Sequence, residues 1–134
     1  PEFVLHLADG KQVIDFRYDD ITLLGFNRAL GKDGSRRYLL DTSTGDVIAS
    51  LPPNIGAAHF NETPVTWIFR AKSYYGIIDE EGNILYEDAK DPLTGVTKFR
   101  HGFSGGQKDN KKWGILKSDG TWLVHPAYDY IKLL

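Results

Sequence analysis

The chain of 134 residues contains no cysteine and no methionine. The lack of cysteine excludes disulfide bonds and thiol chemistry. A chain without cysteine is compatible with the cytoplasm and with a secreted protein that has no disulfide bonds. The cellular compartment therefore stays undetermined, with the cytoplasm slightly favoured. A secretory leader pattern is also missing, and residues 1–3 resemble a cloning remnant.

Charge of one sign is not in excess either. The 16 Lys+Arg and 18 Asp+Glu residues give a net charge of −2, so we expect no nucleic-acid partner. No apolar stretch approaches the roughly 20 residues that span a bilayer, and we expect no membrane insertion. With 41% hydrophobic and 25% charged residues, the chain is predicted to form one domain over residues 1–134.

What the sequence does contain is a repeat. Gly10, Gly45, Gly82 and Gly120 each close a polar turn between two short apolar runs, and they lie 35, 37 and 38 residues apart. A fixed period of this length is typical of units that cannot bury their apolar faces alone. The runs are rich in β-branched and aromatic residues, which predicts β-hairpins in which glycine supplies the positive φ.

A further strand is expected before each hairpin, at residues 26–30, 65–70 and 103–107. No window of ten or more residues shows a 3.6-residue apolar period, so no helix is expected. We predict an all-β fold of stacked antiparallel three-stranded repeat units. There are about four copies, of which the first and last are incomplete, and the stack is either solenoid-like or closed on itself.

The last copy carries a recognisable motif. Residues 112–129 carry a Trp113-Gly114 pair directly after Lys112 and end with Tyr128-Asp129, and this stretch closely resembles the bacterial WG repeat. The Tyr75-Gly76 pair begins a second good copy. The resemblance covers nearly the whole chain, implies a β-rich scaffold of mostly unassigned function, and transfers no catalytic residue.

The large aromatic rings in these motifs are interpreted as side chains that pack between neighbouring repeat units. Trp113 stands beside Gly114, which has no side chain and would let a neighbouring backbone or ring approach closely. Tyr18 and Tyr128 follow their turn glycines at the same offset and receive the same interpretation. Trp113 is therefore expected to be buried.

No catalytic or metal site is expected, and no cofactor. Residues 102–106 match the G-x-S-x-G pattern around Ser104, but that motif needs a strand before the serine and a helix after it. Here a turn into the next repeat follows. The four histidines, His6, His59, His101 and His125, lack metal-ligand spacing. We therefore predict a protein that is not an enzyme.

Two segments depart from the repeat, at residues 51–64 and 87–101, and are here called the first and second insert. Trp67 aligns with Ala29 and Gly105, so a large ring stands where other copies carry small groups. One interpretation is that such rings fill an asymmetric core. The other is a partner-binding surface of aromatic anchors with a polar rim. Its candidate residues are Trp67, Phe69, Phe60, Phe99, Arg100 and His101.

Repeats with variable inserts on one face usually bind through that face. We predict a non-enzymatic protein-interaction module, an inhibitor or immunity-type protein that blocks a partner such as a cognate toxin. The alternative is a cell-envelope or glycan-binding module, in which an exposed Trp67 and the tyrosines would stack on sugars.

Overall fold

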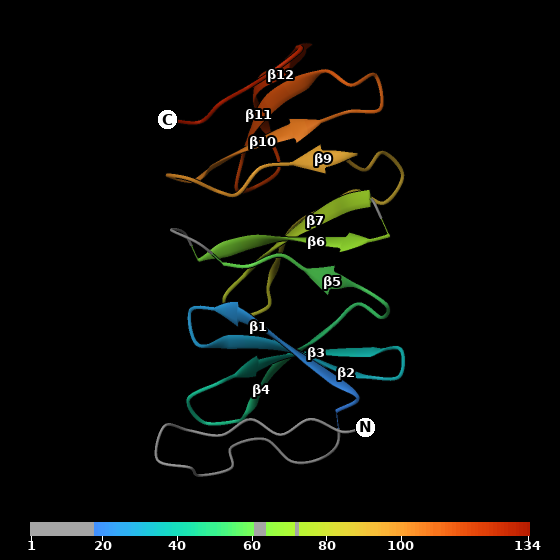
Figure 1. The fold of residues 1–134 in the computed structure, drawn as a ribbon, viewed down its shortest axis with the longest axis vertical. Coiled ribbons are helices and arrows are strands. Elements are labelled where there is room, and N and C mark those ends of the chain that lie inside the picture. The colour runs from blue at the N-terminus through green and yellow to red at the C-terminus, as the bar shows by residue number, and fades with distance from the viewer. Residues whose placement is uncertain (1–17, 61–63, 72) are drawn as a thin grey trace.

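The protein is an elongated stack of three antiparallel β-sheets (Figure 1). The computed structural model describes residues 18–60, 64–71 and 73–134, and within them every regular element is a strand. The first sheet holds β1 (Asp20–Gly25), β2 (Arg28–Asp33), β3 (Arg36–Asp41) and β4 (Val47–Leu51). The second holds β5 (Gly56–Ala57), β6 (Val65–Arg70), β7 (Ser73–Asp79) and β8 (Ile84–Glu87). The third holds β9 (Gly95–Val96), β10 (Phe103–Gln107), β11 (Trp113–Lys117) and β12 (Trp122–Tyr128).

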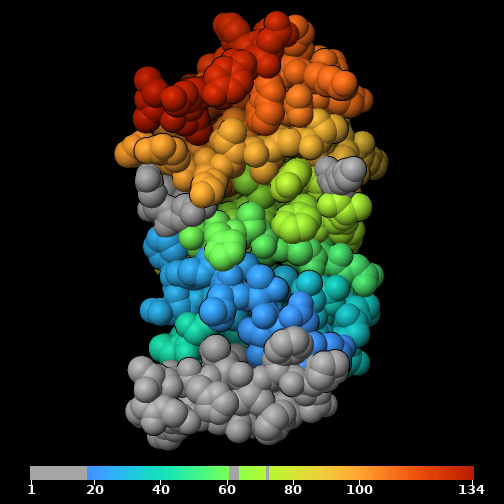
Figure 2. Space-filling view, viewed as in Figure 1, coloured from blue at the N-terminus to red at the C-terminus, as the bar shows by residue number. Residues whose placement is uncertain are grey.

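Neighbouring strands in each sheet are also neighbours in sequence, and the sheets follow one another along the long axis in chain order (Figures 1 and 2). The predicted all-β stack of repeat units is therefore confirmed. Each sheet has four strands, one more than expected, because a segment before the predicted strand also pairs. In the second and third sheets this extra strand is two residues long and comes from an insert. The predicted copy around Gly10 lies outside the described residues.

The hairpin turns form where the glycines predict them. Gly45, Gly82 and Gly120 have φ angles of 81°, 81° and 84°, a region that favours glycine. Each turn also contains an aspartate that accepts local hydrogen bonds. At the last turn, Asp119 Oδ1 accepts from the Thr121 hydroxyl at 2.6 Å and the Thr121 N–H at 3.0 Å. These bonds hold the pKa of the Asp119 carboxyl below its usual value.

The hairpins share one register, but the first is a residue longer. Ile77 pairs with Tyr86 and Ile115 with Val124, and in both sheets the register then shifts by one extra residue on β8 or β12. In the first sheet the equivalent pair is Leu39 with Ala49, which encloses one more residue.

The hairpin between β2 and β3 is in turn one residue shorter than the β6–β7 and β10–β11 hairpins, and this corrects one predicted alignment. Trp67 pairs with Ile77, Gly105 with Ile115, and Leu30 with Leu39. Trp67 is therefore equivalent to Leu30 and not to Ala29. Leu30 is large and buried, so the first sheet also carries a large side chain at this position.

Each sheet has a forward face, which packs on the next sheet in chain order, and a back face. The forward face of the first sheet presents Leu30 and Leu39 to Ile68 and Ile78 on the back of the second. The forward face of the second sheet contributes its own apolar set to the next junction. Its members, with those of the third sheet, are Val65, Trp67, Ile77, Leu93, Phe99 and Leu116. Because the second sheet is covered on both faces, its strands are apolar on both.

Turn glycines also join the sheets. A Cβ added to Gly82 would overlap Ala49 of the first sheet, and a Cβ added to Gly120 would overlap the Tyr86 ring of the second. Ala49 and Tyr86 are equivalent positions of their hairpins. The two junctions therefore have the same geometry: the turn glycine of each hairpin packs against the last strand of the preceding sheet, which is β4 or β8.

The two ends of the stack differ. Tyr18 is buried against Ala29 and Leu40 on the back of the first sheet, as the packing interpretation expects. For Tyr128 that interpretation is wrong, because its side chain is 55% exposed at the end of the third sheet. Leu123 and Tyr130 are also exposed there. The forward face of the third sheet has no described sheet beyond it to cover these side chains.

Candidate functional site

The two inserts meet between the second and third sheets and form a cleft of about 530 Å³. This volume lies within the range of about 300–1,000 Å³ that is usual for ligand pockets. Its walls come from the first insert, from β6 and β7, and from the second insert. The lining residues are Ala58, His59, Thr66, Trp67, Tyr74, Val96, Thr97, Lys98 and Phe99. The inserts are far apart in sequence, so the stacking of the sheets creates this site.

Trp67 forms the floor of the cleft. It is only 1% exposed, and its ring stacks on Phe99 with 5.5 Å between ring centroids and 24° between ring planes. Tyr86 meets the same indole edge-on at 6.4 Å. The indole therefore joins β6 to the second insert and belongs to the core between the two sheets.

The indole N–H is satisfied across the junction. Trp67 Nε1 donates to Ser104 Oγ at 2.9 Å, and Ser104 Oγ lies 2.9 Å from the Thr97 carbonyl oxygen. The Thr97 hydroxyl in turn accepts from the Gly105 N–H at 2.8 Å. Ser104 is fully buried on strand β10, and its hydroxyl connects this strand to the second insert and to the indole. A serine nucleophile would have to be accessible to its substrate, and the Ser104 hydroxyl is not.

We expect Ser104→Ala to lower the free energy of unfolding by about 1–2 kcal/mol, because the buried indole N–H of Trp67 would lose its acceptor. Denaturant unfolding of the two proteins measures this loss. Ser104→Thr keeps a hydroxyl and serves as the partial control. An esterase activity that is present in the parent and absent from Ser104→Ala would contradict this structural role.

The first insert is held by bonds to the same strands. Thr66 Oγ1 lies 2.8 Å from the Ala58 carbonyl oxygen and 3.0 Å from that of His59. The Ala58 N–H donates to the Trp67 carbonyl at 2.9 Å. The wall formed by this insert is therefore fixed to β6, and the polar groups named here bond within the wall.

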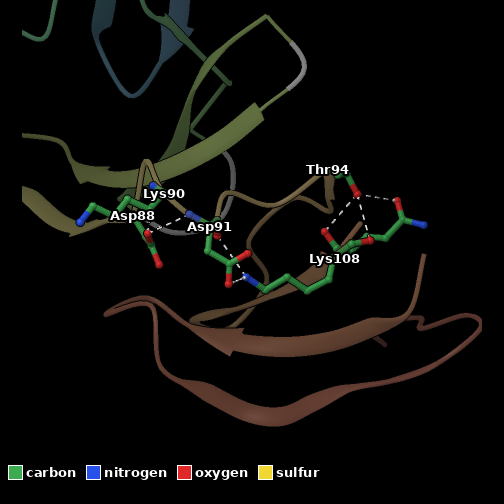
Figure 3. Close-up of polar contacts among 6 residues, drawn as sticks. Asp88, Lys90, Asp91, Thr94 and Lys108 are labelled. Atoms are coloured by element: carbon green, nitrogen blue, oxygen red, sulfur yellow. Dashed lines mark hydrogen bonds and ion pairs between the residues drawn. The ribbon is translucent and has the colours of Figure 1, made fainter. Parts of the chain in front are cut away.

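Ionic and polar contacts fix the second insert (Figure 3). Lys108, at the end of β10, pairs with the Asp91 carboxylate at 2.7 Å and donates to the Asp91 carbonyl at 3.0 Å. Asp88 Oδ1 accepts from the N–H groups of Lys90 and Asp91. Thr94 Oγ1 lies 3.2 Å from the carbonyl oxygens of Gln107 and Lys108. The acidic part of this insert is thereby turned toward Lys108 and lies outside the cleft lining.

The six predicted partner-binding residues fall into three groups. Trp67 and Phe99 lie together in the cleft, but they are buried, and Phe60 is buried in the other junction. Phe69 is half-buried and lies 5.5 Å from Tyr74, ring centroid to centroid. Arg100 and His101 are exposed and follow the cleft residue Phe99 in sequence.

The burial of Trp67 agrees with the alternative interpretation, in which a large ring fills an asymmetric core. That the six residues bind a partner stays a prediction. Two residues of the cleft that were not predicted are His59 and Tyr74. His59 lies within the first insert and Tyr74 on β7, and only the stacking of the sheets places them beside the second insert.

Electrostatics differ between the two sides of the second insert. A second hollow of about 300 Å³ shares Thr97 and Lys98 with the cleft, and Arg100 and Lys132 also line it. None of the described residues that line the two hollows is an aspartate or glutamate. This side of the insert is therefore cationic.

Two phenols near the junctions, one buried and one half-buried, have a raised pKa. Burial raises the pKa of the Tyr86 hydroxyl, and the carboxylates of Asp88 and Asp91 add to that rise. Burial likewise raises the pKa of Tyr75. Among the described residues, no group of three or more His, Asp or Glu is placed to hold a metal ion.

Comparisons with known proteins agree with the repeat. Residues 113–133 match the family model described as a WG containing repeat, which confirms the WG repeat recognised in the last copy. No curated protein matches the chain. The part of the chain that the structure describes holds no helix long and apolar enough to cross a membrane.

One solved structure with a similar fold is the crystal structure of the computationally designed Ika8 protein. The TM-score is 0.55 and the sequence identity 11%, over 92% of this chain and 43% of the designed one. This chain therefore spans less than half the length of that protein, and the likeness concerns the fold alone.

Proposed function

We propose that this chain, an all-β stack that carries a WG repeat, is a non-enzymatic protein-interaction module. Its partner docks where the two inserts meet, over the cleft between the second and third sheets. One observation carries the proposal. The two segments that depart from the repeat come from different units, and they form the walls of one cleft.

An inhibitor of the immunity type suits this arrangement. The cleft lies on a scaffold whose two sheets are joined by a buried apolar cluster, so its shape is preorganised, and a preorganised surface loses little conformational entropy on binding. A cognate toxin is the partner class that we propose for it. The glycan-binding alternative gains no support at Trp67, because the buried indole offers no face for a sugar to stack on.

The test uses one exposed residue from each insert. We expect the double variant His59→Ala/Arg100→Ala to capture the partner from the source cell about tenfold less tightly than the parent, as truncation of an interface centre does. Quantitative pull-down at several bait concentrations gives the change in affinity.

The matched control is Arg36→Ala/His125→Ala, which removes the same two side-chain types from exposed positions of β3 and β12. It should bind like the parent and unfold at the same denaturant concentration as the double variant. Equal capture by all three proteins would place the binding site elsewhere.

A further inference from the structure

The chemistry of the cleft indicates what kind of segment would dock there, and this inference rests on the proposed function. The cleft floor is made of rings and aliphatic groups, among them Trp67, Phe99 and Val96. Trp67 Nε1 and Thr66 Oγ1, two polar side-chain atoms of the lining residues, are bonded within the walls. An apolar side chain entering the cleft therefore leaves those bonds intact, and its transfer from water is favourable.

The rim has the opposite character. Lys98 is exposed and lines both hollows, and Lys132 from the C-terminal segment lines the smaller one. Arg100 also lines that hollow. The nearest acidic cluster of the insert, Asp88 and Asp91, is engaged with its own backbone and with Lys108 (Figure 3). A partner approaching this rim meets positive charge, although the whole chain is slightly acidic.

We propose that the docking segment of the partner is acidic and carries an apolar or aromatic anchor. The anchor enters the cleft between the two inserts, against the half-buried Ala58, Tyr74 and Val96. Carboxylates on either side of it lie against Lys98 and Lys132. The anchor supplies affinity through burial. The charges set the orientation of the segment and accelerate its association, an effect that salt weakens.

The probe is a phage-displayed library of random nonapeptides, selected on the full chain. We expect the selected peptides to combine Asp or Glu with a central Leu, Phe, Tyr or Trp. The dominant peptide, synthesised, should bind Lys98→Glu/Lys132→Glu at least tenfold more weakly than the parent. Arg36→Glu/Lys117→Glu makes the same change of net charge at exposed positions outside the cleft and should bind like the parent.

Selected peptides without acidic enrichment, or a peptide that binds the Lys98→Glu/Lys132→Glu variant as well as the parent, would overturn this inference. The proposed function fails by a different result, namely partner capture that is unaffected by His59→Ala/Arg100→Ala. If that truncation abolishes capture while the selected peptides are not acidic, the docking site stands and its charge preference is wrong.

Discussion

Replacement of Trp67 by alanine should lower the free energy of unfolding by about 3–5 kcal/mol, as for other buried large aromatic residues. The indole lies between two sheets, stacks on Phe99 and donates to Ser104. Its removal would leave a cavity at the junction and expose Ser104 Oγ to that cavity. Urea unfolding followed by circular dichroism measures the loss.

Trp67→Phe separates the two contributions of the indole. A phenyl ring retains most of the stacking on Phe99 but lacks the N–H that Ser104 accepts, so its loss should be smaller than that of Trp67→Ala. If Trp67→Ala unfolds at the same urea concentration as the parent, the ring does not join the sheets.

Replacement of Gly114 by alanine should cost roughly 3 kcal/mol, the upper part of the range for overpacking. An added Cβ would overlap the Val124 carbonyl oxygen of β12 and lie 2.7 Å from the Trp122 ring. A backbone oxygen held in the β11–β12 ladder cannot move aside without breaking strand pairing. Thermal unfolding, with the enthalpy measured by calorimetry, gives the change.

Gly102→Ala is the control for this prediction. Gly102 has a φ of 82° but no atom lies within 4 Å of an added Cβ, so its cost is the left-handed backbone alone, about 1 kcal/mol. Equal destabilisation by the two substitutions would mean that the close approach of β12 to Gly114 adds little to the cost, which contradicts the packing role of this glycine.

The glycine of the Trp-Gly pair is thus explained by close packing, but the residues that pack against it are not those that the sequence predicted. The prediction was that Gly114 lets a neighbouring unit approach. In the structure the close neighbours are Trp122 and the β12 backbone of the same sheet. Trp113 itself is half-buried, so the prediction that it is buried was too strong, and Trp67 is the ring with the larger expected effect.

The all-β stack could be predicted because each hairpin carries its own local signal. Gly45, Gly82 and Gly120 need a positive φ, and the apolar runs beside them form the strands. Register was less predictable. The β2–β3 hairpin is one residue shorter than the β6–β7 and β10–β11 hairpins, so Leu30 and not Ala29 is equivalent to Trp67. A shift of one residue turns a side chain to the other face.

The candidate site was predictable only in part. Departures from the repeat correctly indicated the inserts, and these meet in space. The exposure of the aromatic side chains could not be deduced from the sequence. Alternation of apolar and polar residues along a strand identifies the buried face only when the other face of the sheet is in contact with water. The second sheet is covered on both sides, so Ile68 and Trp67 point in opposite directions and both are buried.

The central claim is that the partner docks over the two inserts, and hydrogen–deuterium exchange of the complex tests it most directly. We predict that the captured partner slows exchange at residues 56–60 and 96–101, on either side of the cleft. The competing surface is the end of the third sheet, where Leu123, Tyr128 and Tyr130 are exposed. Protection confined to β12 and the residues after it, with unchanged exchange in both inserts, would contradict the account.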